Sequence, residues 1–161
     1  MAYQYSVSDV LALTQTLVVN DFTAQGETPG SVPFSFAAQQ YPLNASNLPL
    51  TVIEPKELKV ERTDASSRCL ILSMKIHHYR KRVAGENAEL IAIERLTHLA
   101  ATMENDPRMS ALSPKISIKE TNPTGLSTSL EEEATQARQN VTLAHVSLSV
   151  NIEWDEFRYA E

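Results

Sequence analysis

The strongest pattern of hydrophobic and polar positions covers residues 141–154, which read VTLAHVSLSVNIEW. From position 146 onward every second residue is large and apolar, and the residues between them are polar. Successive side chains of a β-strand point to opposite faces of the sheet, so this alternation predicts a long antiparallel-type strand with one buried face. The apolar positions are Val146, Leu148, Val150, Ile152 and Trp154.

Three runs of strand-like sequence precede this one. Residues 48–54 are apolar and end at Pro55, which has no N–H to donate to a sheet. Residues 57–63 alternate, and residues 68–79 (RCLILSMKIHHY) alternate over a longer run. The short stretch between the last two runs consists of turn-forming residues, so we predict a β-hairpin there.

A first helix is predicted at residues 7–20. Its apolar side chains follow the i, i+3, i+4 spacing of one helical face. Ser6 followed three positions later by Asp9 resembles a capping box, and Ser8 is an alternative N-cap.

A second helix is predicted at residues 87–103, where the hydrophobic period changes from two to about 3.6. Asn87 suits the N-cap position, and Glu89 suits the positive first turn of a helix. Pro107 ends any continuation.

Two long polar segments, residues 23–47 and 121–140, separate these elements and are predicted to be loops. Val32, Phe34 and Phe36 alternate within the first segment. They are compatible with a short edge strand packed within the chain, or with a contact to another subunit.

The element order is therefore helix, loop, three strands, helix, a short strand at 114–120, loop, and a long strand. Helices that interrupt a mostly antiparallel set of strands indicate an α+β fold. We predict one domain, residues 1–161, with two helices packed on one face of the sheet.

Composition narrows the function classes. The chain has 14 basic and 20 acidic residues and a formal charge of −6, which argues against a groove that grips nucleic acid. The single cysteine, Cys69, excludes an intramolecular disulfide, and within a strand pattern it is expected to be a buried small hydrophobe. Neither a signal peptide nor a membrane-spanning run is recognisable, so we expect a soluble protein made inside the cell.

The four histidines do not form a metal-binding pattern. His77 and His78 are neighbours on one predicted strand, so they point to opposite faces and do not bind one metal together. His98 and His145 are isolated, and no His-x-His or His-x-x-x-His pair occurs. We therefore predict no metal-ligating residues.

Other catalytic patterns are also missing from the sequence. It contains no P-loop, dinucleotide fingerprint or Gly-x-Ser-x-Gly motif. Glu131, Glu132 and Glu133 are interpreted as a solvated acidic patch. Glu57, Lys59 and Glu61 are interpreted as the polar face of a strand. We predict no catalytic or cofactor-binding residues, and no enzyme activity.

The element order resembles the tail terminator family of tailed bacteriophages, whose members are also called tail-completion or minor tail proteins. The resemblance covers residues 6–154 and depends on pattern rather than on a motif. It includes the proline-containing strand LPLTV at 48–52 and the final apolar alternation, which ends close to an aromatic residue. The other parts that carry it are the helix at 10–18, the strand at 70–76 and the helix at 92–103. The extended segment at 23–47 departs from the family pattern.

The resemblance implies a structural protein of phage morphogenesis, found in the virion at the tail or neck and in the host cytoplasm during assembly. It implies a homohexameric ring that caps the tail tube and joins it to the head. The expected partners are the tail tube protein and a head-completion or neck protein. DNA would pass through the lumen without specific binding, and no membrane is involved. Residues 23–47 and 121–140 are the expected assembly surfaces.

One alternative remains at this point, a small α+β enzyme or regulatory binding module with a site near His77 and His78. Under the tail terminator hypothesis, the polar face of the last strand is expected to look toward the ring lumen or a neighbouring subunit. That face carries Ser147, Ser149, Asn151 and Glu153.

Overall fold

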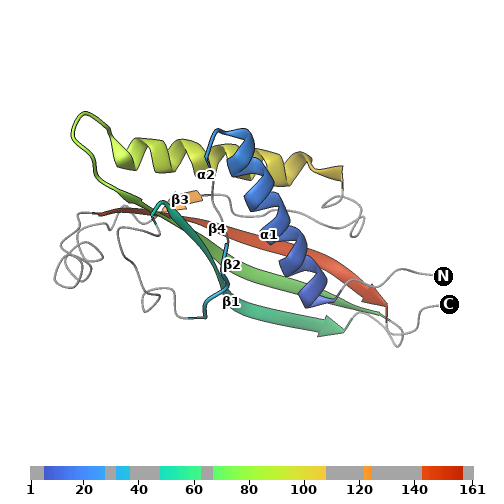
Figure 1. Ribbon diagram of the computed structural model, residues 1–161. Helices are drawn as coiled ribbons and strands as arrows, with labels where there is room; N and C mark the ends of the chain where they lie inside the picture. The colour runs from blue at the N-terminus through green and yellow to red at the C-terminus, as the bar shows by residue number, and fades with distance from the viewer. Residues whose placement is uncertain are drawn as a thin grey trace.

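The fold combines two helices with an antiparallel sheet, which confirms the predicted α+β class (Figure 1). The computed structural model describes residues 6–27, 32–36, 48–62, 67–107, 122–124 and 143–157. The predicted strand at 114–120, the acidic run at 131–133 and most of both predicted loops lie outside these residues. The elements in chain order are α1 (Val7–Ala24), β1 (Leu50–Arg62), β2 (Ser67–Lys81), α2 (Ala88–Asn105), β3 (Asn122–Thr124) and β4 (Leu143–Phe157).

The strand order in the sheet is β1-β2-β4-β3, and every neighbouring pair is antiparallel. Leu72 in the middle of β2 lies opposite Leu58 of β1 and opposite Ile152 of β4. This register aligns the apolar sides of the three long strands, because residues directly opposite each other share a face.

β1 corrects one prediction. The sequence indicated two strands separated at Pro55, but the structure has one strand with a register shift between Pro55 and Glu57. The missing N–H of proline is accommodated at this irregularity, where the extra residue Lys56 lies, and β1 then continues along β2. The bulge also shifts the alternation, so that Ile53 and Leu58 share the face toward the helices.

The helices begin where capping chemistry predicts. Ser6, not Ser8, is the N-cap of α1, and Ser6 and Asp9 form a reciprocal capping box with hydrogen bonds of 2.9 and 3.1 Å. Asn87 caps α2 by accepting a hydrogen bond from the Leu90 N–H at 3.1 Å. Both helices extend beyond the predicted ends, α1 by four residues and α2 by two.

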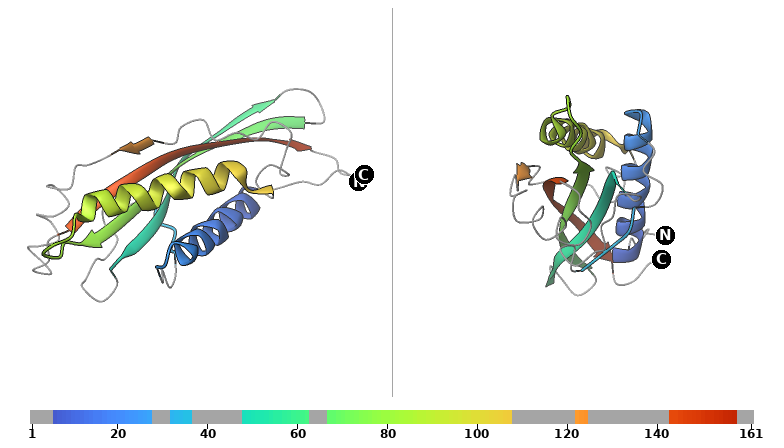
Figure 2. Two further views of the ribbon diagram at one scale, coloured as in Figure 1. Left: turned by 90° about the horizontal axis from the view of Figure 1, so that it is seen from above. Right: turned by 60° about the vertical axis from the view of Figure 1, so that its left-hand side comes forward.

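Both helices lie side by side on one face of the twisted sheet, as predicted (Figure 2). α1 contributes Val18 and Phe22 to the core between helices and sheet, and α2 contributes Leu96 and Leu99. Full burial of each such side chain contributes about 1.5–3 kcal/mol. The strand side of the core consists of Ile53, Leu70, Leu72, Met74, Ile76, Val146, Leu148, Val150, Ile152 and Trp154.

The opposite face of the sheet, here called the far face, is also buried at one end. Leu50, Val52 and Tyr79 are buried there, although the pattern predicted one apolar face only. Ser147 is buried on the same face, where Thr124 of β3 pairs with it. The expectation that the polar side of β4 looks toward a lumen or a neighbour is therefore wrong for Ser147.

The short segment 32–36 lies along β1. Phe34 forms an isolated parallel bridge with Ile53. Ser35 N–H donates to the Ile53 carbonyl and Ile53 N–H donates to the Pro33 carbonyl, both at 3.0 Å. Val32 is buried, but Phe36 is 82% exposed. The predicted edge pairing within the chain is confirmed for Phe34, whereas Phe36 lies in solvent.

Candidate functional site

His77 and His78 lie on opposite faces of β2, as the strand period predicted, and each is the centre of a separate buried cluster. The helix-side cluster is defined by Glu27, His78, Arg80 and Arg95. The far-face cluster is defined by Glu54, His77, Tyr79 and His145.

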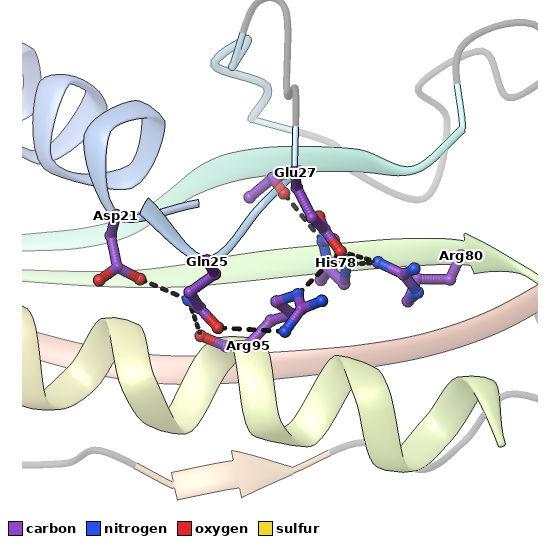
Figure 3. Close-up of polar contacts among 7 residues, drawn as sticks. Asp21, Gln25, Glu27, His78, Arg80 and Arg95 are labelled. Carbon is purple, nitrogen blue, oxygen red and sulfur yellow. Dashed lines mark hydrogen bonds and ion pairs between the residues drawn. The ribbon is translucent and has the colours of Figure 1, made fainter. Parts of the chain in front are cut away.

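The carboxylate of Glu27 joins three elements in the helix-side cluster (Figure 3). Glu27 follows α1, where a sharp turn at Gly26, with φ of +93°, brings the chain back toward the sheet. The carboxylate accepts a hydrogen bond of 2.9 Å from Arg95 Nε on α2 and forms an ion pair with Arg80 on β2. The end of α1 is thereby fixed to both α2 and the sheet.

His78 lies beneath this ion pair and is fully buried. Its Nε2 is 3.3 Å from Arg80 Nη1, and because arginine only donates, Nε2 must be the unprotonated acceptor. The proton of the neutral ring is then on Nδ1, which donates to Thr51 Oγ1 at 2.9 Å. The ring also meets the edge of Phe22 with 5.1 Å between centroids.

Burial determines the charge of these groups. It lowers the pKa of His78 to about 3, because the charged ring would lose its solvation and the nearby Glu27 offsets only part of that loss. Burial alone would raise the pKa of Glu27, but the hydrogen bond from Arg95 and the charge of Arg80 hold that pKa below its ordinary value. The cluster therefore contains a carboxylate, two guanidinium groups and a neutral histidine at neutral pH.

A second set of hydrogen bonds joins the two helices beside this cluster. The buried Asp21 of α1 accepts from His98 Nδ1 at 2.7 Å and from Thr102 Oγ1 at 2.5 Å, both on α2. Gln25 donates to Asp21 at 2.6 Å and to the Arg95 carbonyl at 3.1 Å. The contacts of Asp21 with His98 and Thr102, and of Gln25 with the Arg95 carbonyl, thus hold the end of α1 against α2.

The far-face cluster is a chain of three hydrogen-bonded side chains. His77 Nε2 is 2.8 Å from Glu54 Oε1, and His77 Nδ1 is 2.8 Å from His145 Nε2. If the carboxylate accepts from His77 Nε2–H, then Nδ1 of a neutral His77 accepts from His145 Nε2–H. Protons therefore point in one direction along the chain, from His145 to His77 to Glu54.

Aromatic stacking completes this cluster. The rings of Tyr79 and His145 are nearly parallel, with 4.4 Å between centroids. The rings of His77 and His145, which share the hydrogen bond, have centroids 5.0 Å apart. Burial lowers the pKa of His145 to about 3, and it lowers the pKa of His77 although Glu54 opposes this shift. Both rings are neutral at physiological pH.

The two nitrogens of His77 both have hydrogen-bond partners within the protein. A general base needs a nitrogen that reaches a substrate, but both nitrogens of His77 are already hydrogen-bonded and the ring is buried. Nor, within the part of the chain that the structure describes, do any three His, Cys, Asp or Glu side chains form a group that could hold a metal ion. The buried chain of hydrogen bonds instead fixes β1, β2 and β4 relative to one another.

The sequence identified His77 and His78 but not their partners. Glu27 and Arg95 are 68 residues apart, and His77 and His145 are also 68 apart, so no local spacing relates them. Cys69 is buried, as expected, and its Sγ lies 3.5 Å from Glu153 Oε1. The polar face with Glu57, Lys59 and Glu61 is exposed, as the alternation predicted.

Comparisons with known proteins do not assign a family. No protein-family model matches this chain, and no curated protein is significantly similar to it. Among the described helices, α1 and α2 included, none has the length and apolar character needed to cross a membrane.

Proposed function

We propose that this protein is a structural subunit of a bacteriophage tail, a tail terminator that forms a ring of six subunits at the end of the tail tube. The observation that carries this proposal is the order and placement of the elements. One helix, a long hairpin, a second helix and two further strands follow in sequence, and both helices cover the same sheet face. This is the element order of the family that the sequence resembles.

The two histidine clusters support a structural role. In each, the charged and polar side chains are paired with one another and are buried or largely buried, which stabilises the fold. A subunit that bears mechanical load between a head and a tail benefits from helices fixed firmly to the sheet. The Glu27 ion pairs provide such a connection.

The charge and the surface are also compatible with a ring. The net charge of −6 disfavours adhesion of DNA that passes through a lumen. Several large apolar side chains are exposed and available for contacts with neighbouring subunits, the tail tube protein or a neck protein. They are Phe36, Leu58, Val60, Val83 and Leu90.

The experiment that tests the proposal is native mass spectrometry of the purified full chain, together with electron microscopy of the same sample. We expect ring-shaped particles with six subunits in each ring and a central opening. Addition of purified tail tubes should place these rings at one tube end. A protein that stays monomeric at high concentration and leaves tubes uncapped would refute the proposal.

A further inference from the structure

The second half of β1 forms an edge of the sheet. β1 is the first strand in the sheet order and pairs with β2 on its inner side. On its outer side the segment 32–36 bonds to Ile53. From Lys56 to Arg62, no residue that the structure describes pairs with the outer side of β1. An open edge of this kind is a template for another strand.

Apolar side chains lie next to this edge. Leu58 and Val60 lie opposite Leu72 and Leu70, on the helix side of the sheet, but they are 44% and 48% exposed. Leu58 also lines an open groove of about 220 Å³, together with Val7, Leu11 and Phe36. The edge therefore offers both backbone hydrogen bonds and apolar surface to a strand that docks on it.

The opposite side of the edge carries charges of both signs. Lys59 and Glu61 are exposed on the far face, two positions apart. Neither has an ion pair with any residue that the structure describes. Each is thus free to pair with an opposite charge on an incoming strand.

We propose that this edge binds a second copy of the chain, in an antiparallel pair whose two-fold axis passes through Val60. Residues that lie opposite each other in an antiparallel pair point to the same face of the sheet. Because faces alternate along β1, an odd-numbered residue must pair with an odd-numbered one and an even-numbered residue with an even-numbered one. A pair centred on Val60 places Lys59 of each copy opposite Glu61 of the other. It also places the two Val60 side chains together and keeps the paired residues within 58–62, away from the bulge.

The neighbouring registers are less favourable. A pair centred on Lys59 places Glu57 opposite Glu61 and Lys59 opposite itself, and like charges in opposite positions repel. A pair centred on Leu58 brings the bulged residue Lys56 into the ladder. Charge complementarity together with the position of the bulge therefore favours a second copy of the chain in the register centred on Val60.

This contact goes beyond the proposed ring. Two copies related by a two-fold axis use the same surface on both sides, whereas neighbours in a ring of six use two different surfaces. The edge contact therefore joins two single subunits, or subunits of two rings, and is independent of the contacts that close a ring.

Sedimentation equilibrium of the full chain tests the edge contact with four variants. Lys59→Glu alone and Glu61→Lys alone each place like charges opposite each other twice per pair. We expect either change to weaken the two-fold association on the order of tenfold. The double variant restores opposite charges and should recover wild-type association. Glu57→Lys is the matched control, since residue 57 lies outside the paired span, and should leave the association unchanged.

The outcomes separate this inference from the proposed function. A wild-type mass of two or twelve subunits that falls to one or six in the single variants, and recovers in the double variant, supports the edge contact. A ring of six, or a monomer, whose mass the charge changes do not alter overturns it. Loss of association in Glu57→Lys, or failure of the double variant to recover, also overturns the register. A charge-dependent dimer without any ring supports the edge contact and refutes the tail terminator proposal.

Discussion

Glu27 and Arg95 are 68 residues apart in the sequence, yet Arg95 Nε donates a hydrogen bond of 2.9 Å to Glu27 Oε1. The carboxylate is 8% exposed and also pairs with Arg80, so one acidic group is surrounded by two cations and a neutral histidine. The two ion pairs of Glu27 connect the end of α1 with the middle of α2 and with the end of β2.

Replacement of Glu27 tests the strength of this connection. In Glu27→Gln the amide is nearly isosteric, but Arg80 and Arg95 lose their shared counter-charge while they remain mostly buried. We expect the free energy of unfolding to decrease by about 2–3 kcal/mol, as for other partly buried ion pairs that lose one member. Urea denaturation followed by circular dichroism measures the change.

The matched control is Glu94→Gln on the exposed side of α2, which removes the same charge one residue before Arg95. It should leave the urea midpoint near that of the wild type. Equal midpoints for the two variants would show that the Glu27 contacts do not stabilise the fold.

The buried histidines predict a pH dependence of stability. His78 and His145 have a pKa of about 3 in the folded protein and an ordinary pKa near 6.5 when unfolded. Between these values the unfolded chain binds more protons, so the free energy of unfolding decreases as the pH falls. The stabilisation is fully present above pH 6.5 and is progressively lost from there toward pH 3. Below pH 4.5, protonation of Glu27 acts in the same direction.

Urea denaturation at pH 7.5, 6 and 5 measures this effect. Each histidine that takes up a proton on unfolding contributes a slope of up to about 1.4 kcal/mol per pH unit. His145→Gln, which cannot be protonated, should reduce the slope, whatever its effect on stability at pH 7.5. A free energy of unfolding that is constant between pH 7.5 and 5 contradicts the burial of neutral rings.

The hydrogen-bond partners also determine the tautomers of the histidines. His78 should carry its proton on Nδ1, because Arg80 donates to Nε2 and Thr51 Oγ1 accepts from Nδ1. His145 should carry its proton on Nε2, which faces Nδ1 of His77. The ¹⁵N chemical shifts of the imidazole nitrogens at pH 7.5 distinguish the two tautomers.

Thr51→Val provides a variant for the same question. It removes the acceptor of the His78 proton and leaves a buried donor unpaired, so we expect a cost of about 1–3 kcal/mol. Thr51→Ser keeps the hydroxyl and should preserve the ¹⁵N shifts of His78. Finding the Nε2–H form of His78 in the wild type would contradict the assigned pairing with Arg80.

The sequence predicts most of the fold, because the relevant signals are local. The alternation that ends at Trp154, the helical stripe with Leu96 and the antiparallel pairing of β1 with β2 each depend on residues close in sequence. The break predicted at Pro55 is wrong for a physical reason. A strand can pass a proline by a bulge, and whether it does so depends on pairing with a partner strand, which local sequence does not specify.

The polar clusters were beyond prediction for a related reason. Glu54 belongs to β1 and His145 belongs to β4. Both are hydrogen-bonded to His77, because β1 and β4 flank β2 on its two sides. The sequence predicted residues 48–54 as an apolar strand and His145 as an isolated histidine, and no local signal relates either residue to His77. Mutual hydrogen bonding and ring stacking allow these polar side chains to be buried at the same end as Leu50 and Val52.

The start of α1 gives a prediction that separates two N-cap assignments compatible with the sequence. Ser6 Oγ accepts from the Asp9 N–H at 3.1 Å, and Asp9 accepts from the Ser6 N–H at 2.9 Å, whereas Ser8 is an exposed residue of the first turn. Ser6→Ala leaves a helix N–H without its side-chain partner and should cost about 1 kcal/mol. Ser8→Ala should be neutral or slightly stabilising, since alanine has the higher helix propensity. The urea midpoints of the two variants measure this difference, and the reverse order would assign the N-cap to Ser8.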